Sequence, residues 1–366
     1  MSLFGTNGRL MPKVRSAVAL ACTLGVSLAL SAVAVVPEGA DLAKVKAQKG
    51  AVFTFVVEDE DAKASEDAEE SAAETDSSST SDSADEDAKA SEAAGEPAIA
   101  SSAAPTLSTE SEKAITKAIS AAEKRGTNVG LVLIDLTTGA GLGYNVDKNI
   151  SGASSVKASC VTWVRQSFVD TGKARLTKEY PSGIYNSQGY LTVTSSKPLQ
   201  DIMRKALVKS DNADYLALRE DFSEKSYVKW LASCGIDDAE RMVQDTDFPH
   251  YSARDCACIW LRIASYIRDD SENAQLLASW LSDAEFSNIG KALKNQGATI
   301  YCKAGWNADV GYQGCCEGSY VVCDGREYVL CVMTDAAAYA DYDDPACKDL
   351  QAIAAAAFAA RGELAG

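Results

Sequence analysis

Ser154-Ser155-Val156-Lys157 opens a long helical block directly after two strand-like runs. In a helix, Ser154 and Lys157 are one turn apart, which places both side chains on the same face. A Lys amine that is held near a Ser hydroxyl and partly desolvated can lose its proton and act as a base. The spacing therefore indicates a nucleophile with its base. Taken alone, the pattern also fits a Ser N-cap followed by a solvent-facing Lys.

Two further motifs follow along the chain. Ser210-Asp211-Asn212 comes directly after a helical run over residues 199–208, and by itself it fits a helix N-cap cluster. Lys303-Ala304-Gly305 comes at the end of a predicted strand, where a Lys needs no special role. Each motif is weak by itself, so the information lies in their order.

In this order, the three motifs resemble the Ser-x-x-Lys, Ser-Asp-Asn and Lys-Thr-Gly set of penicillin-recognising serine enzymes. The resemblance to class A β-lactamases and their relatives extends over residues 107–366. It implies an α+β fold in which a five-stranded antiparallel sheet, flanked by the two terminal helices, carries an inserted all-helical lobe. The active site would lie between the sheet and the lobe.

The resemblance also implies a catalytic role for residues of the first two motifs. Ser154 would be the nucleophile and Lys157 its base. Ser210 would relay a proton to the leaving group, while Asn212 would orient both the substrate amide and Lys157.

The third motif would form the substrate-binding strand. By resemblance, Lys303 would attract a substrate carboxylate, and Gly305 would let the substrate approach the strand edge closely. The backbone N–H groups of Ser154 and Trp306 would form the oxyanion hole, a preorganised donor pair for acyl transfer. Ala304 departs from the usual Thr or Ser and removes a hydroxyl that helps to bind a carboxylate.

A second departure concerns the loop that carries a Glu in class A β-lactamases, where it activates the deacylating water. The corresponding segment, 235–252, is short and lacks the Glu-x-x-Leu-Asn pattern. Glu240, Asp245 and Asp247 are the nearby acids. We therefore expect acylation to be intact and deacylation to lack its usual base.

The order of expected elements agrees with this fold. A helix capped by Ser108 should end near Gly126, and a buried strand over residues 129–135 should turn at Thr138-Gly139 into a second strand. Asp324-Gly325 reads as a tight hairpin turn. The expected order is two strands, a helical block and three strands, with a helix at each end. This order indicates the α+β class. The other expected elements are helices over 156–169, 199–208, 226–233, 253–267 and 345–361 and strands over 298–302, 319–323 and 328–333.

Two kinds of function fit these motifs. The first is a serine hydrolase with an acyl-enzyme on Ser154, either a β-lactamase or a D,D-peptidase. The second is a penicillin-binding or cell-wall-binding module without turnover, which the missing Glu and Ala304 favour. In either case the partner is a small-molecule β-lactam or a peptidoglycan peptide, and we expect a monomer that needs no cofactor and no metal.

Residues 1–36 read as an export segment. Arg9, Lys13 and Arg15 precede an uncharged apolar run of 21 residues, 16–36. This run is long for the apolar h-region of a signal peptide and just long enough to span a bilayer. A cleaved signal peptide and an uncleaved transmembrane anchor both remain open. Because the positive residues precede the run, the rest of the chain is expected outside the cell, secreted or at its surface. Membrane contact is expected only through residues 16–36.

Residues 37–106 are expected to be a disordered acidic linker ahead of a folded domain at 107–366. The exception is Val52-Phe53-Thr54-Phe55-Val56-Val57, which fits either a short strand or an exposed apolar patch. Between Glu58 and Glu96, 16 Asp and Glu stand against two Lys, a charge of −14 out of the total of −17. Bulky apolar residues are nearly absent from this stretch, so it cannot offset its ordering entropy by burial. The remainder is close to neutral and has no basic stripe, which argues against nucleic acid as a partner.

Ten of the eleven Cys lie at Cys160 or beyond it. In an exported domain they are compatible with disulfides, and free buried thiols are the alternative. The usual Cys-x-x-Cys spacing of a metal site is missing, and the single His, His250, cannot complete a mixed site. We expect His250 in a surface loop, because a Lys base removes the need for a catalytic His.

Overall fold

A computed structural model describes residues 42–46, 48–57, 103–185, 191–244 and 247–365 of the chain. The predicted export segment at 1–36 and the acidic stretch from Glu58 to Glu96 lie outside the described residues. Within the described ranges, no helix has both the length and the apolar character needed to cross a bilayer.

An antiparallel sheet of six strands forms the centre of the fold, in the order β1-β3-β2-β10-β9-β8. The turn between the last two strands has positive φ at Asp324 (54°) and Gly325 (74°), the conformation that a two-residue hairpin requires. Arg326 therefore lies opposite Cys323, as predicted. The strands of this sheet are β1 (Phe53–Val56), β2 (Val129–Asp135), β3 (Ala140–Tyr144), β8 (Thr299–Asn307), β9 (Gly314–Cys323) and β10 (Arg326–Thr334).

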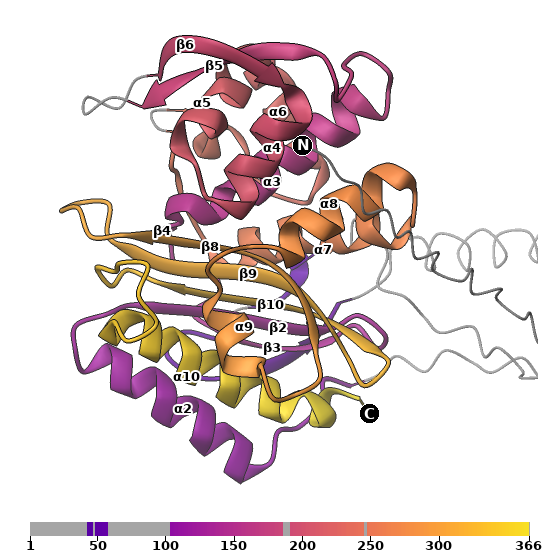
Figure 1. The fold of residues 1–366 in the computed structure, drawn as a ribbon. Coiled ribbons are helices and arrows are strands. Elements are labelled where there is room, and N and C mark those ends of the chain that lie inside the picture. The colour runs from indigo at the N-terminus through magenta and orange to yellow at the C-terminus, as the bar shows by residue number, and fades with distance from the viewer. Residues whose placement is uncertain (1–41, 47, 58–102, 186–190, 245–246, 366) are drawn as a thin grey trace, which may run out of the picture. The chain divides into compact units, whose positions relative to one another are not determined.

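Helices cover both faces of this sheet (Figure 1). The first and last helices, α2 (Thr109–Glu123) and α10 (Pro345–Ala359), lie side by side on one face. Ser108 caps α2 by accepting a hydrogen bond from the Ser111 N–H, as the sequence predicted. The other helices are α3 (Lys157–Val164), α4 (Leu199–Val208), α5 (Asn212–Asp221), α6 (Glu224–Ser233), α7 (Ala253–Arg268), α8 (Glu272–Ser282) and α9 (Asn288–Leu293).

The core is divided by the sheet into two clusters. Leu133 and Ile134 are neighbours on β2 and both are fully buried, yet Leu133 belongs to the cluster under α2 and α10 and Ile134 to the cluster under the helical lobe. Successive strand residues point to opposite faces. A strand that is buried on both faces therefore appears as a continuous apolar run, and β2 does.

The sheet has one strand more than predicted. We expected five strands and a linker over residues 37–106, but β1 pairs with β3 from Phe53 to Val56. Phe53, Phe55 and Val57 are buried in the core. Residues 42–57 therefore belong to the folded domain, and the boundary expected at 107 was wrong for them. A six-residue apolar stretch beside a low-complexity segment gives no sequence signal of its distant partner, which explains the miss.

The inserted lobe is not all-helical. It carries an antiparallel hairpin of β5 (Glu179–Tyr185) and β6 (Leu191–Pro198), and a short pair of β4 (Ile150–Ser151) and β7 (His250–Tyr251). Most of β6 is exposed, so the alternating apolar pattern of a half-buried strand is absent from its sequence. The helix expected at 156–169 ends as α3 at Val164 and continues as a π-helical turn, Arg165–Val169.

Among the ten Cys in the described residues, eight are buried thiols that form no disulfide, so for these the alternative of free buried thiols holds: Cys160, Cys256, Cys302, Cys315, Cys316, Cys323, Cys331 and Cys347. The Sγ atoms of Cys315 and Cys347 lie 3.9 Å apart, which is thiol contact and not a bond.

Candidate active site

Ser154 lies in a tight turn between the sheet and α3. A 3₁₀ turn, Ala153–Val156, precedes α3, and Ala153 has a φ of 45°. The hydroxyl of Ser155 donates to the Gly152 carbonyl oxygen at 2.6 Å and contacts the Tyr251 hydroxyl at 2.5 Å. The Tyr251 ring lies so close to Gly152 that a Cβ there would sit 1.9 Å from it. This packing fixes the turn and leaves Ser154 partly exposed.

Lys157 is fully buried, with 0% of its surface exposed. Its Nζ donates to Asn212 Oδ1 and to the Ser210 carbonyl oxygen, both at 2.6 Å, and lies 3.4 Å from Ser210 Oγ. Burial, and then the charge of Lys303, lower its pKa well below the ordinary value for Lys. The amine therefore loses its proton more readily than an ordinary Lys, and in its neutral form it can accept one.

Ser210 stands between two lysines. Lys303 Nζ donates to Ser210 Oγ at 3.0 Å and to the carbonyl oxygen of the next residue, Ala304, at 2.6 Å. Burial lowers the pKa of Lys303 to about 8. Ser210 has a φ of 55°, a left-handed conformation that is uncommon for Ser and is often found at functional sites. The structure thus links Lys157, Ser210, Asn212 and Lys303 through one hydrogen-bonded chain.

The second motif also serves as a helix cap. Asp211 is the N-cap of α5 and accepts a hydrogen bond from the Asp214 N–H at 3.0 Å. Both interpretations of Ser210-Asp211-Asn212 therefore hold together, because Asp211 caps the helix while its two neighbours contact Lys157.

Two expectations for the third motif change. Lys303 lies in the middle of β8, not at a strand end, and is 2% exposed. Gly305 is needed for the protein's own backbone, since a Cβ there would sit 2.4 Å from the Gly152 carbonyl oxygen and 2.8 Å from the Ser154 nitrogen. This close approach places the Ser154 nitrogen beside Gly305, the β8 residue just before Trp306.

Aromatic rings line Lys157 on the side of the shortened loop. Its Nζ is 5.6 Å from the Phe248 ring centroid and 5.7 Å from that of Tyr215. These two rings contact each other at 5.3 Å. Sequence reasoning missed both, although Tyr215 lies one turn beyond Asn212 on α5.

The nearby acids face elsewhere. The Asp247 carboxylate lies 3.7 Å from Arg219 NH1 in an ion pair, and burial raises its pKa above the usual value. Glu240 is exposed and accepts from Gln244 Nε2 at 3.4 Å. Asp245 lies outside the described residues. Among the described acids, neither Glu240 nor Asp247 hydrogen-bonds Lys157.

A cavity of about 240 Å³ opens beside Ser210, Lys303 and Trp306. Its far wall is Phe286, whose ring meets that of Trp306 edge-on at 5.1 Å. Lys303 Nζ lies 5.6 Å from the Trp306 ring. No motif in the sequence indicated Phe286, because this residue comes from the segment between α8 and α9. In the described ranges, no group of three or more His, Cys, Asp or Glu is arranged to hold a metal ion.

His250 is exposed, and its connection to the site is the backbone pairing of β7 with β4. It lies opposite Ser151 in the β4–β7 pair, and its carbonyl oxygen accepts from Arg241 NH1 at 2.7 Å. Its position agrees with the expectation of a surface residue outside the chemistry.

Comparison with known proteins places this arrangement in a family. Residues 110–360 match the β-lactamase enzyme family, whereas a search of curated proteins finds no match. The fold is similar to that of a PBP-A mutant solved as an acyl-enzyme complex with penicillin-G, with a TM-score of 0.55 and 17% identity over 68% of this chain and 96% of that one. A β-lactamase from Sphaerobacter thermophilus gives a TM-score of 0.55 and 20% identity over 68% and 97% of the two chains. A class A β-lactamase from Mycobacterium abscessus gives 0.53 and 17% over 68% and 99%. The chain therefore belongs to the β-lactamase enzyme family.

Proposed function

We propose that this protein is a serine hydrolase that forms an acyl-enzyme on Ser154 with β-lactams or with related peptidoglycan peptides. The observation that carries the proposal is the state of Lys157. Its amine is buried, hydrogen-bonded to Asn212 and Ser210, and lowered in pKa. A desolvated Lys of this kind is an effective base at neutral pH, and it belongs to the same motif as the partly exposed Ser154.

Acylation would proceed through three proton transfers. Lys157 Nζ takes the proton of Ser154 Oγ, and the oxygen attacks the carbonyl carbon of the substrate. The developing oxyanion is stabilised by the N–H groups of Ser154 and Trp306. When the carbon–nitrogen bond breaks, the leaving nitrogen takes the proton of Ser210 Oγ. Lys157, 3.4 Å from that oxygen, returns the proton to Ser210.

Deacylation would be slow. The step needs a base that activates water at the acyl carbonyl, and the Phe248 ring lies where the shortened loop meets Lys157. A positioned general base contributes about 10²- to 10⁴-fold to such a step. This observation favours the alternative of a penicillin-binding protein with little turnover over an efficient β-lactamase. D,D-peptidase activity stays open, because its substrate forms the same acyl-enzyme.

We also propose that the protein is exported, remaining at the cell surface or secreted, and that it acts as a monomer. Support for export comes from the charged start and the apolar run at 16–36, and from the similarity to a fold whose solved members include penicillin-binding proteins.

Labelling with a fluorescent penicillin tests the proposal. The expected result is one covalent label per chain that persists for minutes or longer after excess reagent is removed. Absence of any covalent label would contradict the proposed acyl transfer, and rapid loss of the label would contradict slow deacylation alone.

A further inference from the structure

Residues 42–46 and 48–57 lie at the edge of the sheet, and we call them the N-terminal strap. Within it, Phe53 lies opposite Gly143 and Phe55 opposite Gly141. A Cβ on Gly141 would sit 2.4 Å from the Phe55 ring, and one on Gly143 would sit 3.0 Å from the Phe53 ring. Glycines in a strand interior mark such close approach. The surface of β3 is therefore shaped to receive these two rings.

The start of the N-terminal strap is held by a second, separate attachment. Arg254, at the first turn of α7, donates to the Leu42 carbonyl oxygen and, at 2.8 Å, to that of Val45. Leu42 and Val45 are both buried in the core cluster. The Gly50 N–H donates to Asn145 Oδ1 at 3.0 Å. The strap is thus attached at its start to Arg254, in its middle to Asn145 and at its end to β3.

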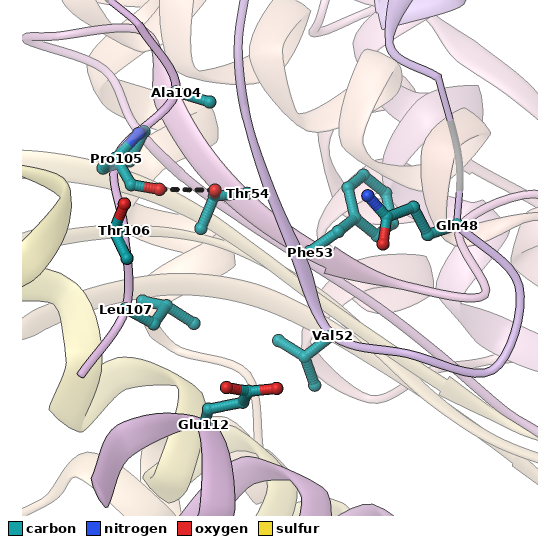
Figure 2. A pocket seen from close by; sticks show the side chains of 9 residues that line it. All are labelled: Gln48, Val52, Phe53, Thr54, Ala104, Pro105, Thr106, Leu107 and Glu112. Carbon is teal, nitrogen blue, oxygen red and sulfur yellow. Dashed lines mark hydrogen bonds between the residues drawn. The ribbon is translucent and has the colours of Figure 1, made fainter. Parts of the chain in front are cut away.

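The chain also returns to the same strand after the acidic stretch. Thr54 Oγ1 donates to the Pro105 carbonyl oxygen at 2.5 Å (Figure 2). Val52 and Leu107 line one hollow of about 290 Å³ with these residues. Just beyond Thr54, the Val57 N–H donates to the Gly139 carbonyl oxygen at 2.9 Å. The described residues that precede and follow the acidic stretch therefore meet at one strand, where Thr54 contacts Pro105.

From these contacts we infer that the N-terminal strap is a donor strand that the domain holds without help from the acidic segment. The acidic segment, with its charge of −14 between Glu58 and Glu96, joins two parts of one folded unit. Because it follows the strap in the sequence, the acidic segment is not a spacer between the domain and the residues before Leu42. Between the apolar run and the strap stand only residues 37–41, a chain that spans at most about 20 Å when extended.

Cutting the acidic segment tests this inference. A recognition sequence for a site-specific protease is inserted after Ser78, and the full chain is cleaved in mild detergent and passed over a gel-filtration column under native conditions. A donor strand predicts that the two fragments co-elute and separate only in denaturant. If the acidic segment alone held the strap to the domain, the C-terminal fragment would elute alone after cleavage. That result, with no substitution other than the protease site, would overturn the inference.

A matched pair of variants locates the attachment. Phe55→Ser removes a buried ring of the strap and should release the fragment after cleavage, whereas Lys49→Ser, at an exposed strap position, should not. Retention of the fragment in Phe55→Ser would contradict the role of β1. If the Phe55→Ser protein does not fold before cleavage, the inference is still tested by the cleaved protein without this substitution, whose two fragments either co-elute or separate. Covalent labelling of Ser154 is not used as a readout, so this test stands apart from the proposed function.

Discussion

The ring centroid of Phe248 lies 5.6 Å from the Nζ of Lys157, on the side of the site that the shortened loop covers. A carboxylate at this position would lie beside Lys157, and we expect it to serve as a base for water at an acyl group on Ser154. Phe248→Glu should therefore shorten the lifetime of the acyl-enzyme, by about 10- to 100-fold given the usual contribution of a general base. The release of label from the fluorescent penicillin adduct measures it.

Phe248→Leu is the matched control, since it removes the ring without adding a base. Its adduct should live as long as that of the unaltered protein. If both substitutions shorten the lifetime equally, the ring acts by excluding water and our account of deacylation is wrong.

Lys157→Ala should slow acylation by several powers of ten, because it removes the base of a coupled catalytic unit. Lys157→Arg keeps a cation but cannot give up its proton at neutral pH, so it should be equally slow. The rate of label incorporation, with circular dichroism as a check on folding, measures both. An active Lys157→Arg protein would show that the positive charge matters and the base does not.

Lys303 should make carboxylate recognition depend on pH. Its pKa is lowered to about 8 by burial, so it loses its charge as the pH rises through that value. The acylation rate for a β-lactam carboxylate, divided by that for its methyl ester, should fall between pH 7 and 9. Using the ratio cancels the titration of Lys157. A ratio that stays constant would mean that Lys303 does not contact the carboxylate.

Glu317 should make the domain less stable as the pH rises from acid to neutral. Burial raises its pKa from 4.5 to about 7, so between these values the folded state holds a proton that the unfolded state has released. The stability from this group is full below pH 4.5 and lost as the pH approaches 7. A shift of this size corresponds to about 3 kcal/mol.

Glu317→Gln removes the titration and keeps an acceptor for Ser287 Oγ, which donates to Glu317 at 2.5 Å. The difference in free energy of unfolding between the two proteins should change between pH 5 and pH 7.5, with only the unaltered protein losing stability. Parallel curves over this range would contradict a buried protonated Glu317.

Local signals in the sequence were sufficient for much of the fold. The cap at Ser108, the strand over 129–135 and the turn at Asp324-Gly325 each depend on residues adjacent in the chain, and each is as predicted. The family match agrees with the three motifs. What failed depends on distant partners: β1 needs the glycines of β3, and β5–β6 exposes too much surface to leave an apolar pattern.

The candidate site divides in the same way. Spacing within a helix was enough to propose Lys157 as a base near Ser154. The contact of Lys157 with Asn212, which the resemblance implied, is present in the structure, and the structure adds the hydrogen bond from Lys157 to the Ser210 carbonyl oxygen. The aromatic lining by Tyr215 and Phe248 could not be predicted, because the two rings come from segments with no shared spacing to the motif. Gly305 was expected to admit substrate, but its space is taken by the backbone at Gly152. The sequence indicates that a residue without a side chain is needed at this position, but it does not show which neighbouring group occupies the space.

The central claim is that Ser154 carries the acyl group, and peptide mapping by mass spectrometry after exposure to a β-lactam tests it most directly. We predict an adduct of the reagent's full mass on the peptide that contains Ser154, and no adduct anywhere in Ser154→Ala. An adduct that persists in Ser154→Ala, or that maps to another residue in the unaltered protein, would contradict the account.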